Sequence, residues 1–319
     1  MNVVRSLDQL HREKNSVVTV GTFDGVHLAH REIIREVTHR ARMIEGRSVV
    51  VTFDPHPKEV VHSPKQGEVR LLTTLEERAT LLAACGVDDL VVLPFTVEFS
   101  EQTPREFAQR ILVNRIGAAE VVVGYDHMFG RGRSAGTEEL VTLGKEFDFS
   151  VFAVHPYTVD GEAVSSTRIR RALATGDLPH AEKLLGYRYG ISGKVVRGDR
   201  RGATIGFPTA NITPASIRKV VPARGVYVVA VELEGNTLFG MMNIGVRPTV
   251  TPGMSETMEV HLFAYSGDLY GATLRVTFLA RLRDEKKFAG LPELVEQLGK
   301  DREASLLLLR QLELEQIRN

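Results

Sequence analysis

The sequence predicts an α/β domain followed by an antiparallel β domain. Apolar runs alternate with helical patterns up to about residue 187, and beyond that point the hydrophobic period changes to two. The chain of 319 residues is also long for one compact core. We therefore expect two domains, residues 1–184 and 185–319, with the boundary near the segment LPHAEKLLGYRYG, where a short helix should end at Gly186.

The first domain is predicted to contain a parallel sheet, because its strand candidates are almost entirely apolar and so suit burial on both faces. These candidates are residues 16–20, 48–53, 89–95, 120–124 and 150–156. Amphipathic helix candidates separate them, at residues 29–45, 74–86, 103–117 and 137–147. The second helix candidate begins with the capping-box pattern of Thr74 and Glu77. Such alternation forms βαβ units in a right-handed, Rossmann-like sheet, whose ligands bind at the carboxyl ends of the strands.

The second domain is predicted to be a small antiparallel barrel with a helical extension. Its strand candidates have glycine-containing turns between them, and a closed barrel would hide their edges. They are residues 187–196, 225–233, 237–245, 255–265 and 273–283. The tail that begins at Leu291 is amphipathic and predicts the terminal helix.

Composition narrows the classes of function. Forty basic residues balance forty acidic ones, which gives no support for general binding to nucleic acid or membrane surfaces. The single cysteine, Cys85, excludes an internal disulfide and a multi-cysteine zinc site. The first residues lack the apolar core of a signal peptide, and no segment approaches the ~20 apolar residues of a membrane helix. We expect a cytoplasmic protein, and the sequence carries no signal for its oligomeric state.

The segment GTFDGVHLAH, which we call the histidine turn (residues 21–30), follows the first strand candidate. If residues from Gly21 to Gly25 form the turn, the free N–H groups of the next helix create an anion site. His27 and His30 would share a face of that helix, and could stabilise charge on a leaving pyrophosphate. Two alternatives remain open: incidental histidines, one capping and one exposed, or a metal-binding pair.

Three other polar motifs are expected at the same sheet edge. FDPHP (residues 53–57) follows the second strand candidate, and GYDHMFGRGRSAG (residues 124–136) follows the fourth. SSTRIR (residues 165–170) follows the fifth, and offers two hydroxyls, a helix start, and two arginines, Arg168 and Arg170, for phosphates. A plain helix cap followed by solvated arginines is the alternative for this last motif.

The second domain contains a glycine-rich segment of its own. GKVVRGDRRGATIGFPTANI (residues 193–212) lacks the Gly-Lys-Ser/Thr ending of a P-loop, yet its glycines would let backbone N–H groups approach phosphates. These glycines are Gly193, Gly198, Gly202 and Gly206. Thr209 and Asn211 lie two apart, and their oxygens suit Mg²⁺. A simple turn after a strand is the alternative for the PTAN tetrapeptide.

Glu259 is the candidate proton acceptor of this domain. In a strand, Glu259 and His261 point to one face while Val260 and Leu262 point to the other. Glu259 is solvated if the other face is the core, or it lines a pocket and takes the proton of an attacking hydroxyl. Periodicity alone leaves both possibilities open.

These motifs resemble the nucleotidylyltransferase superfamily and, over nearly the whole chain, the bacterial bifunctional riboflavin kinase/FAD synthetase family. The resemblance implies that His27 and His30 act at the ATP phosphates and that SSTRIR is a second phosphate-contacting motif. The ATP-binding residues that it implies are Gly21, Phe23, Asp24, Gly25, Ser165, Ser166, Thr167 and Arg168. It implies that Asp126 and Phe129 contact flavin. Ala29 replaces the family's usual glycine, and His127 its usual phenylalanine.

The second half resembles the riboflavin kinase domain, whose most specific motif is GFPTAN. This resemblance implies that Thr209 and Asn211 hold Mg²⁺ with ATP, that the four glycines contact ATP, and that Glu259 is the general base for the riboflavin 5′-hydroxyl. We therefore expect an enzyme that makes FMN from riboflavin and ATP, and then FAD and pyrophosphate from FMN and a second ATP. The alternatives are an enzyme in which only the kinase half is active and a flavin-binding regulator without activity.

Overall fold

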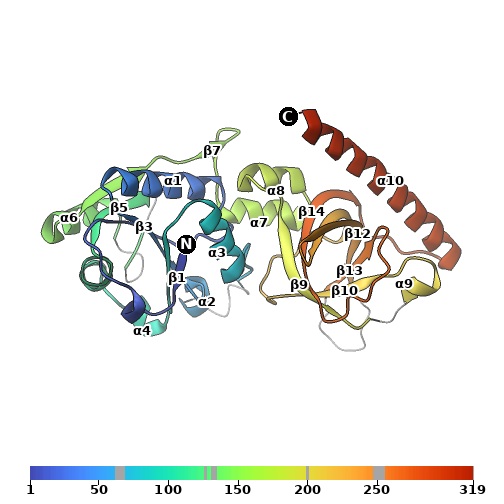
Figure 1. Cartoon of the computed structure of the whole chain (residues 1–319), viewed down its shortest axis with the longest axis horizontal. Coiled ribbons are helices and arrows are strands. Elements are labelled where there is room, and N and C mark those ends of the chain that lie inside the picture. Colours follow the sequence, from blue (N-terminus) through green and yellow to red (C-terminus); the bar gives the residue numbers. More distant parts are fainter. Residues whose placement is uncertain (62–68, 126–127, 131–134, 199–200, 247–255, 319) are drawn as a thin grey trace. The chain divides into compact units, whose positions relative to one another are not determined.

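The computed structural model describes residues 1–61, 69–125, 128–130, 135–198, 201–246 and 256–318. Its contacts divide the chain into two compact units, Met1–Ser166 and Thr167–Asn319, an α/β unit and a barrel unit (Figure 1). This division groups helices α7 (Ser166–Thr175) and α8 (Leu178–Leu185) with the barrel. The boundary after residue 184 remains a sequence prediction. No helix within the described ranges combines the length and apolar character needed to cross a membrane.

The α/β unit has a six-stranded parallel sheet in the order β1-β4-β3-β2-β5-β6, which confirms the predicted fold class. The strands are β1 (Asn2–Val4), β2 (Ser16–Val20), β3 (Arg47–Phe53), β4 (Asp89–Leu93), β5 (Ala118–Gly124) and β6 (Ser150–Val154). The sequence analysis missed β1, which has only three residues. Strand β4 ends two residues earlier than predicted, because Pro94 has no N–H for a ladder hydrogen bond.

Helices cover both faces of this sheet. They are α1 (Leu28–Met43), α2 (Pro57–Val61), α3 (Leu75–Ala84), α4 (Val97–Ser100), α5 (Pro104–Phe107), its π-helical continuation η3 (Ala108–Ile116) and α6 (Thr137–Phe147). The unit also contains a short 3-10 helix, η1 (Leu7–Gln9), and a separate hairpin of β7 (Thr158–Val159) and β8 (Glu162–Ala163). Val18 and Val49 face the cluster formed with α5, η3 and α6. Val17 and Val50 face the opposite clusters, with α1 and α3. The capping box of Thr74 and Glu77 is confirmed.

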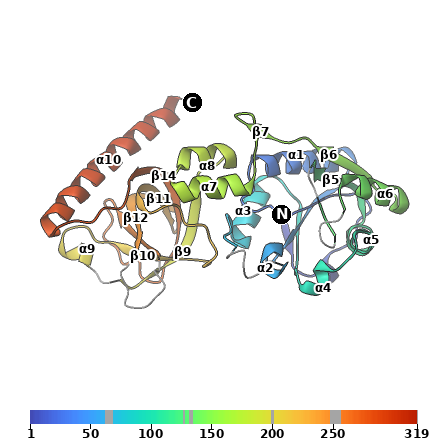
Figure 2. The same cartoon turned by 180° about the vertical axis from the view of Figure 1, so that it is seen from behind.

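The barrel unit is a closed antiparallel barrel in the order β10-β13-β12-β11-β14-β9, as the period of two predicted. Its strands are β9 (Gly190–Val196), β10 (Ala210–Pro214), β11 (Gly225–Leu233), β12 (Asn236–Val246), β13 (Glu256–Leu262) and β14 (Thr273–Arg283). Short helix α9 (Arg201–Thr204) precedes β10. Helix α10 (Leu291–Arg318) is the predicted extension and contacts β12 and β14 (Figure 2). Arg283 of β14 joins it through a paired hydrogen bond to Asp301, at 2.9 and 2.6 Å.

Candidate active sites

The histidine turn has an unusual backbone. Phe23, Gly25 and Val26 have φ angles of 47°, 88° and 37°. Positive φ is unfavourable for a bulky phenylalanine and more so for a β-branched valine. Such conformations persist only where the surrounding structure holds them, and they cluster at functional sites. Phe23 and Val26 are both buried, which anchors the two strained positions in the core.

Asp24 fastens this turn to the segment that precedes α3. Its buried carboxylate accepts hydrogen bonds from the backbone N–H of Leu72 at 3.1 Å and of Thr73 at 2.9 Å, and from the Thr73 hydroxyl at 3.2 Å. The same hydroxyl oxygen accepts the Gly25 N–H at 3.0 Å. The resemblance implied that Asp24 contacts ATP, whereas these bonds direct its carboxylate to the protein backbone. No sequence pattern pointed to Thr73.

The two histidines lie together at the start of α1. Their rings stack with centroids 3.6 Å apart, and the His27 Nδ1 accepts the His30 N–H at 3.4 Å, so His27 is the cap of the helix. His30 is not the exposed histidine of the simplest alternative, because its ring also packs edge-on against Phe23. Burial, and then the charges of His27 and Arg78, hold the pKa of His30 well below its usual range. His30 is therefore a neutral imidazole at neutral pH.

Other predicted motifs approach the same turn within the α/β unit. The Ser166 hydroxyl donates to the Asp24 carbonyl at 2.9 Å, which brings the start of SSTRIR to the histidine turn. The Thr52 hydroxyl donates to the Thr22 carbonyl at 3.2 Å, which ties the end of β3 to it. Thr167 and Arg168 belong to the barrel unit in the contact division. Among the described residues, no three His, Cys, Asp or Glu side chains gather as a metal site would require.

Phe129 belongs to a chain of aromatic contacts. Its ring centroid lies 6.3 Å from that of Phe107, which lies 6.1 Å from that of Phe99. The chain continues through Phe95, at 5.5 Å from Phe99, to Phe53 at the end of β3, at 5.4 Å. The sequence analysis missed Phe95 and Phe99, although Phe95 follows a strand at the edge where ligands bind. Asp126 and His127 lie outside the described residues.

In the barrel, Glu259 is the centre of a polar row across three strands. It is opposite Asn211 of β10 and Asn243 of β12, and it accepts the Thr209 hydroxyl at 3.5 Å. Val260 and Leu262 are buried, so Glu259 is on the outer face, yet it is half-buried rather than fully solvated. Asn211 is in a strand and not in a turn. The sequence analysis gave Asn243 no role, although it is in a predicted strand.

The loop before β10 packs closely on this row. A Cβ at Gly198 would lie 2.1 Å from the Asn211 amide nitrogen, and a Cβ at Gly202 would lie 2.2 Å from the Phe207 carbonyl oxygen. Any larger residue would therefore displace the segment that carries Thr209 and Asn211. Gly193 is in the wall of the barrel, where its Cβ would meet a backbone carbonyl of β10, and Gly206 has a positive φ. His261 donates from Nδ1 to the Pro208 carbonyl at 2.8 Å, which holds the start of the same segment.

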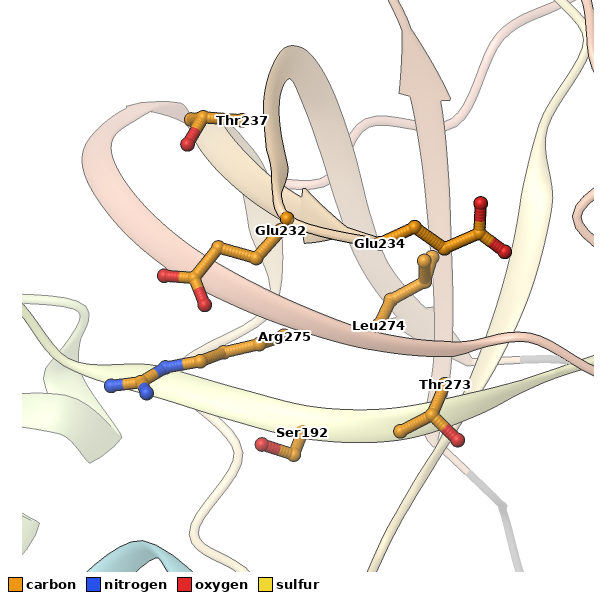
Figure 3. A pocket seen from close by; sticks show the side chains of 8 residues that line it. Ser192, Glu232, Glu234, Thr237, Thr273, Leu274 and Arg275 are labelled. Carbon is orange, nitrogen blue, oxygen red and sulfur yellow. The ribbon is translucent and has the colours of Figure 1, made fainter. Parts of the chain in front are cut away.

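A hollow of about 370 Å³ lies elsewhere on the barrel surface (Figure 3). A cross-strand row lines it: Arg275 of β14 is opposite Ser192 of β9 and Glu232 of β11, and Glu232 is opposite Thr237 of β12. The side chains of Ser192, Glu232 and Arg275 point the same way in Figure 3. None of the predicted site residues lines this hollow.

Comparison with known proteins assigns each unit. Residues 9–168 match the FAD synthetase family, and residues 185–309 match the riboflavin kinase family. An FAD synthetase domain followed by a riboflavin kinase domain defines an enzyme of flavin-nucleotide synthesis. The chain belongs to the bifunctional riboflavin kinase/FMN adenylyltransferase family. Both catalytic domains are present, so the alternative with only an active kinase is not favoured.

Named relatives cover almost the whole chain. A bifunctional riboflavin kinase/FMN adenylyltransferase from Listeria monocytogenes is 37% identical over 301 residues, 94% of each chain. The protein of the same name from Escherichia coli K12 is 38% identical over 304 residues, 94% of this chain and 96% of its own. A crystal structure titled as a macrolide-efflux protein from Streptococcus pneumoniae has a TM-score of 0.86 at 34% identity, covering 95% and 97% of the two chains. Its title differs from the names of the relatives, with which both family matches agree.

Proposed function

We propose that this chain phosphorylates riboflavin at the barrel site and adenylylates FMN at the histidine turn. The observation that carries the proposal is the correspondence between sites and families. The unit with the histidine turn matches the FAD synthetase family, and the unit with the Glu259 row matches the riboflavin kinase family. Each unit therefore has its own set of groups suited to phosphate chemistry.

In the adenylyl transfer, a phosphate oxygen of FMN attacks the α-phosphorus of ATP, and pyrophosphate leaves. His27 and His30 stand at the positive end of α1, where they donate hydrogen bonds to the leaving phosphates. Glycines of the turn, Ser165 and Ser166 contribute further donors, while Asp24 acts by shaping the turn. The aromatic side chains that end the contacts from Phe53 to Phe129 offer a surface on which the flavin ring stacks.

In the kinase reaction, Glu259 takes the proton of the riboflavin 5′-hydroxyl as the oxygen attacks the γ-phosphorus of ATP, and ADP leaves. The Thr209 hydroxyl and the neighbouring Asn211 orient this carboxylate. The oxygens of Thr209 and Asn211 are hard ligands that fit Mg²⁺, which would neutralise phosphate charge. The glycines of the segment 193–206 leave its backbone N–H groups free of side chains, so that these groups can approach the nucleotide. Gly198 also packs so closely on Asn211 that a larger residue would displace this side chain.

Product analysis with two variants tests this assignment. Wild type, His30→Ala and Glu259→Ala are each incubated with riboflavin, ATP and Mg²⁺, and flavins are separated by chromatography. His30→Ala should accumulate FMN, with FAD formation reduced by about 10²–10³, the usual effect of losing one donor to developing charge. Glu259→Ala should make little FMN but should still convert supplied FMN into FAD.

Each variant is thus the control for the fold of the other half. The assignment is wrong if either substitution abolishes both activities in a protein that keeps its circular dichroism spectrum. It is also wrong if wild type forms no FAD from FMN and ATP.

Thr209→Val tests the proposed Mg²⁺ ligands. Valine keeps the shape of threonine but lacks the hydroxyl oxygen, so the kinase should need more Mg²⁺ for half-maximal rate. The measurement is a Mg²⁺ titration of each activity. Adenylylation of FMN by the same variant should have an unchanged titration curve, and equal kinase curves for variant and wild type would remove Thr209 from the ligand set.

A further inference from the structure

Arg78 is a buried cation that forms no ion pair with a carboxylate of the described residues. It projects from α3 and is 3% exposed. Its Nη1 donates to the Thr52 hydroxyl at 2.9 Å and to the Phe53 carbonyl at 3.4 Å. Over the described ranges, its guanidinium forms no ion pair with a carboxylate, and its buried Nε has no hydrogen-bond acceptor.

This arrangement is costly for the protein alone. An uncompensated charge in a protein interior is strongly unfavourable, even after relaxation. Burial lowers the pKa of Arg78, and the nearest acidic groups, Asp24, Asp54 and Glu76, oppose that shift only at a distance. A guanidinium nevertheless remains protonated at neutral pH. The positive charge therefore persists in the interior of the α/β unit.

The position of Arg78 suggests what balances the charge. Its partner Thr52 is at the carboxyl end of β3 and donates in turn to the Thr22 carbonyl of the histidine turn. The charge of Arg78 also depresses the pKa of His30, so the two side chains are electrostatic neighbours. Arg78 thus lies behind the edge where ATP and FMN would bring several negative charges.

We propose that Arg78 is a positioning residue of the adenylyl-transfer site, whose charge is balanced by the phosphates of bound ATP and FMN and not by a protein carboxylate. This inference rests on the proposed function of the histidine turn. Nη1 fixes the end of β3, and the remaining charge attracts the phosphate chain toward His27 and His30. The role is electrostatic, so a lysine should fulfil most of it and a neutral side chain should not.

The test compares Arg78→Met with Arg78→Lys. Arg78→Met should have an unliganded Tm equal to or above that of wild type, because a costly charge is removed. Its KM for ATP or FMN in adenylylation should rise at least tenfold, while the kinase activity stays unchanged. Arg78→Lys keeps a group that can carry the charge, so its KM should rise less than that of Arg78→Met. Arg47→Met, which removes a buried arginine with a carboxylate partner, is the matched control and should lower the Tm without changing KM.

Two results would overturn the inference. One is an Arg78→Met protein that loses several degrees of unliganded Tm or does not fold, since the charge would then serve the fold. The other is an unchanged KM for both substrates. Calorimetric titration with inorganic pyrophosphate separates this inference from the proposed function. If the wild type makes no FAD, and the Arg78→Met variant binds pyrophosphate more weakly than the wild type, the proposed function is wrong but the role of Arg78 stands. If the wild type makes FAD, and both proteins bind pyrophosphate equally well, the proposed function stands but the role of Arg78 is wrong.

Discussion

A buried arginine lies at each end of β3, and the two differ in how many hydrogen bonds their guanidinium groups make. At the amino end, every guanidinium nitrogen of Arg47 donates a hydrogen bond. Its acceptors are the Asp89 carboxylate at 2.9 Å, the Ser16 hydroxyl at 3.0 Å, and the carbonyls of His11 at 2.7 Å and Ile116 at 3.2 Å. At the carboxyl end, Arg78 donates from one nitrogen only and has no carboxylate partner within the described ranges.

The difference extends to the neighbours of each arginine. At the amino edge, Ser48 and Asp88 exchange hydrogen bonds, with Asp88 accepting from both the Ser48 N–H and its hydroxyl. At the carboxyl edge, the buried Nδ1 of His30 has no hydrogen-bond partner in the described parts of the chain. Buried polar groups normally find partners, so incomplete pairing calls for an explanation. We interpret the polar groups at the amino edge as paired within the protein for stability, and those at the carboxyl edge as left to pair with the phosphates of a bound substrate.

The largest expected effect is at the amino edge. Arg47→Met should destabilise the α/β unit by about 3–5 kcal/mol, because it leaves Asp89 as an unpaired buried carboxylate. Urea unfolding followed by circular dichroism measures the change. The KM values for ATP and FMN should remain those of wild type below the unfolding transition. A loss of substrate affinity without a loss of stability would contradict the division between the two edges.

Asp24→Asn is expected to have a smaller effect and tests an exception to this division. Asp24 is at the carboxyl edge, yet its carboxylate is already paired with Leu72 and Thr73. An amide nitrogen would face one of these N–H donors, at a cost of about 1–3 kcal/mol. Both stability and FAD formation should fall, because the turn that carries His27 loses its anchor. FMN formation by the same variant is the control, and a loss of FAD formation at unchanged stability would instead favour direct contact between Asp24 and ATP.

The sequence predicted what local pattern determines. Buried parallel strands, the period-two barrel strands and the capping box at Thr74 depend on neighbouring residues, and the structure contains all of them. Strand β10 escaped prediction because PTAN is equally compatible with a turn. Helix candidate 103–117 continues as a π-helix after Phe107, since apolar spacing over a short segment does not separate the two helix types. These misses concern residues whose conformation depends on tertiary context.

The site divides along the same line. The motifs singled out His27 and His30 in one unit and Thr209, Asn211 and Glu259 in the other, and the structure brings each group together. The pairing of Asp24 with Thr73, the isolation of Arg78 and the aromatic chain to Phe129 could not be predicted. The Asp24–Thr73 pairing and the aromatic chain join segments tens of residues apart. A local sequence pattern also does not indicate whether a buried charge such as Arg78 has a partner.

The smallest expected effect is an acid-side loss of stability due to His30. Burial keeps the folded-state pKa of His30 well below its usual value, so the unfolded chain takes up a proton first as pH falls. This contribution to stability is complete above about pH 6.5, the unfolded value, and is lost as pH falls from there toward the folded pKa, by at most about 1.4 kcal/mol per pH unit. His30→Gln has no titrating ring and should lose stability less steeply below pH 6.5. Urea midpoints measured from pH 7.5 to 5.0 compare the two proteins, and parallel curves would mean that His30 is protonated as readily in the folded protein as in the unfolded chain.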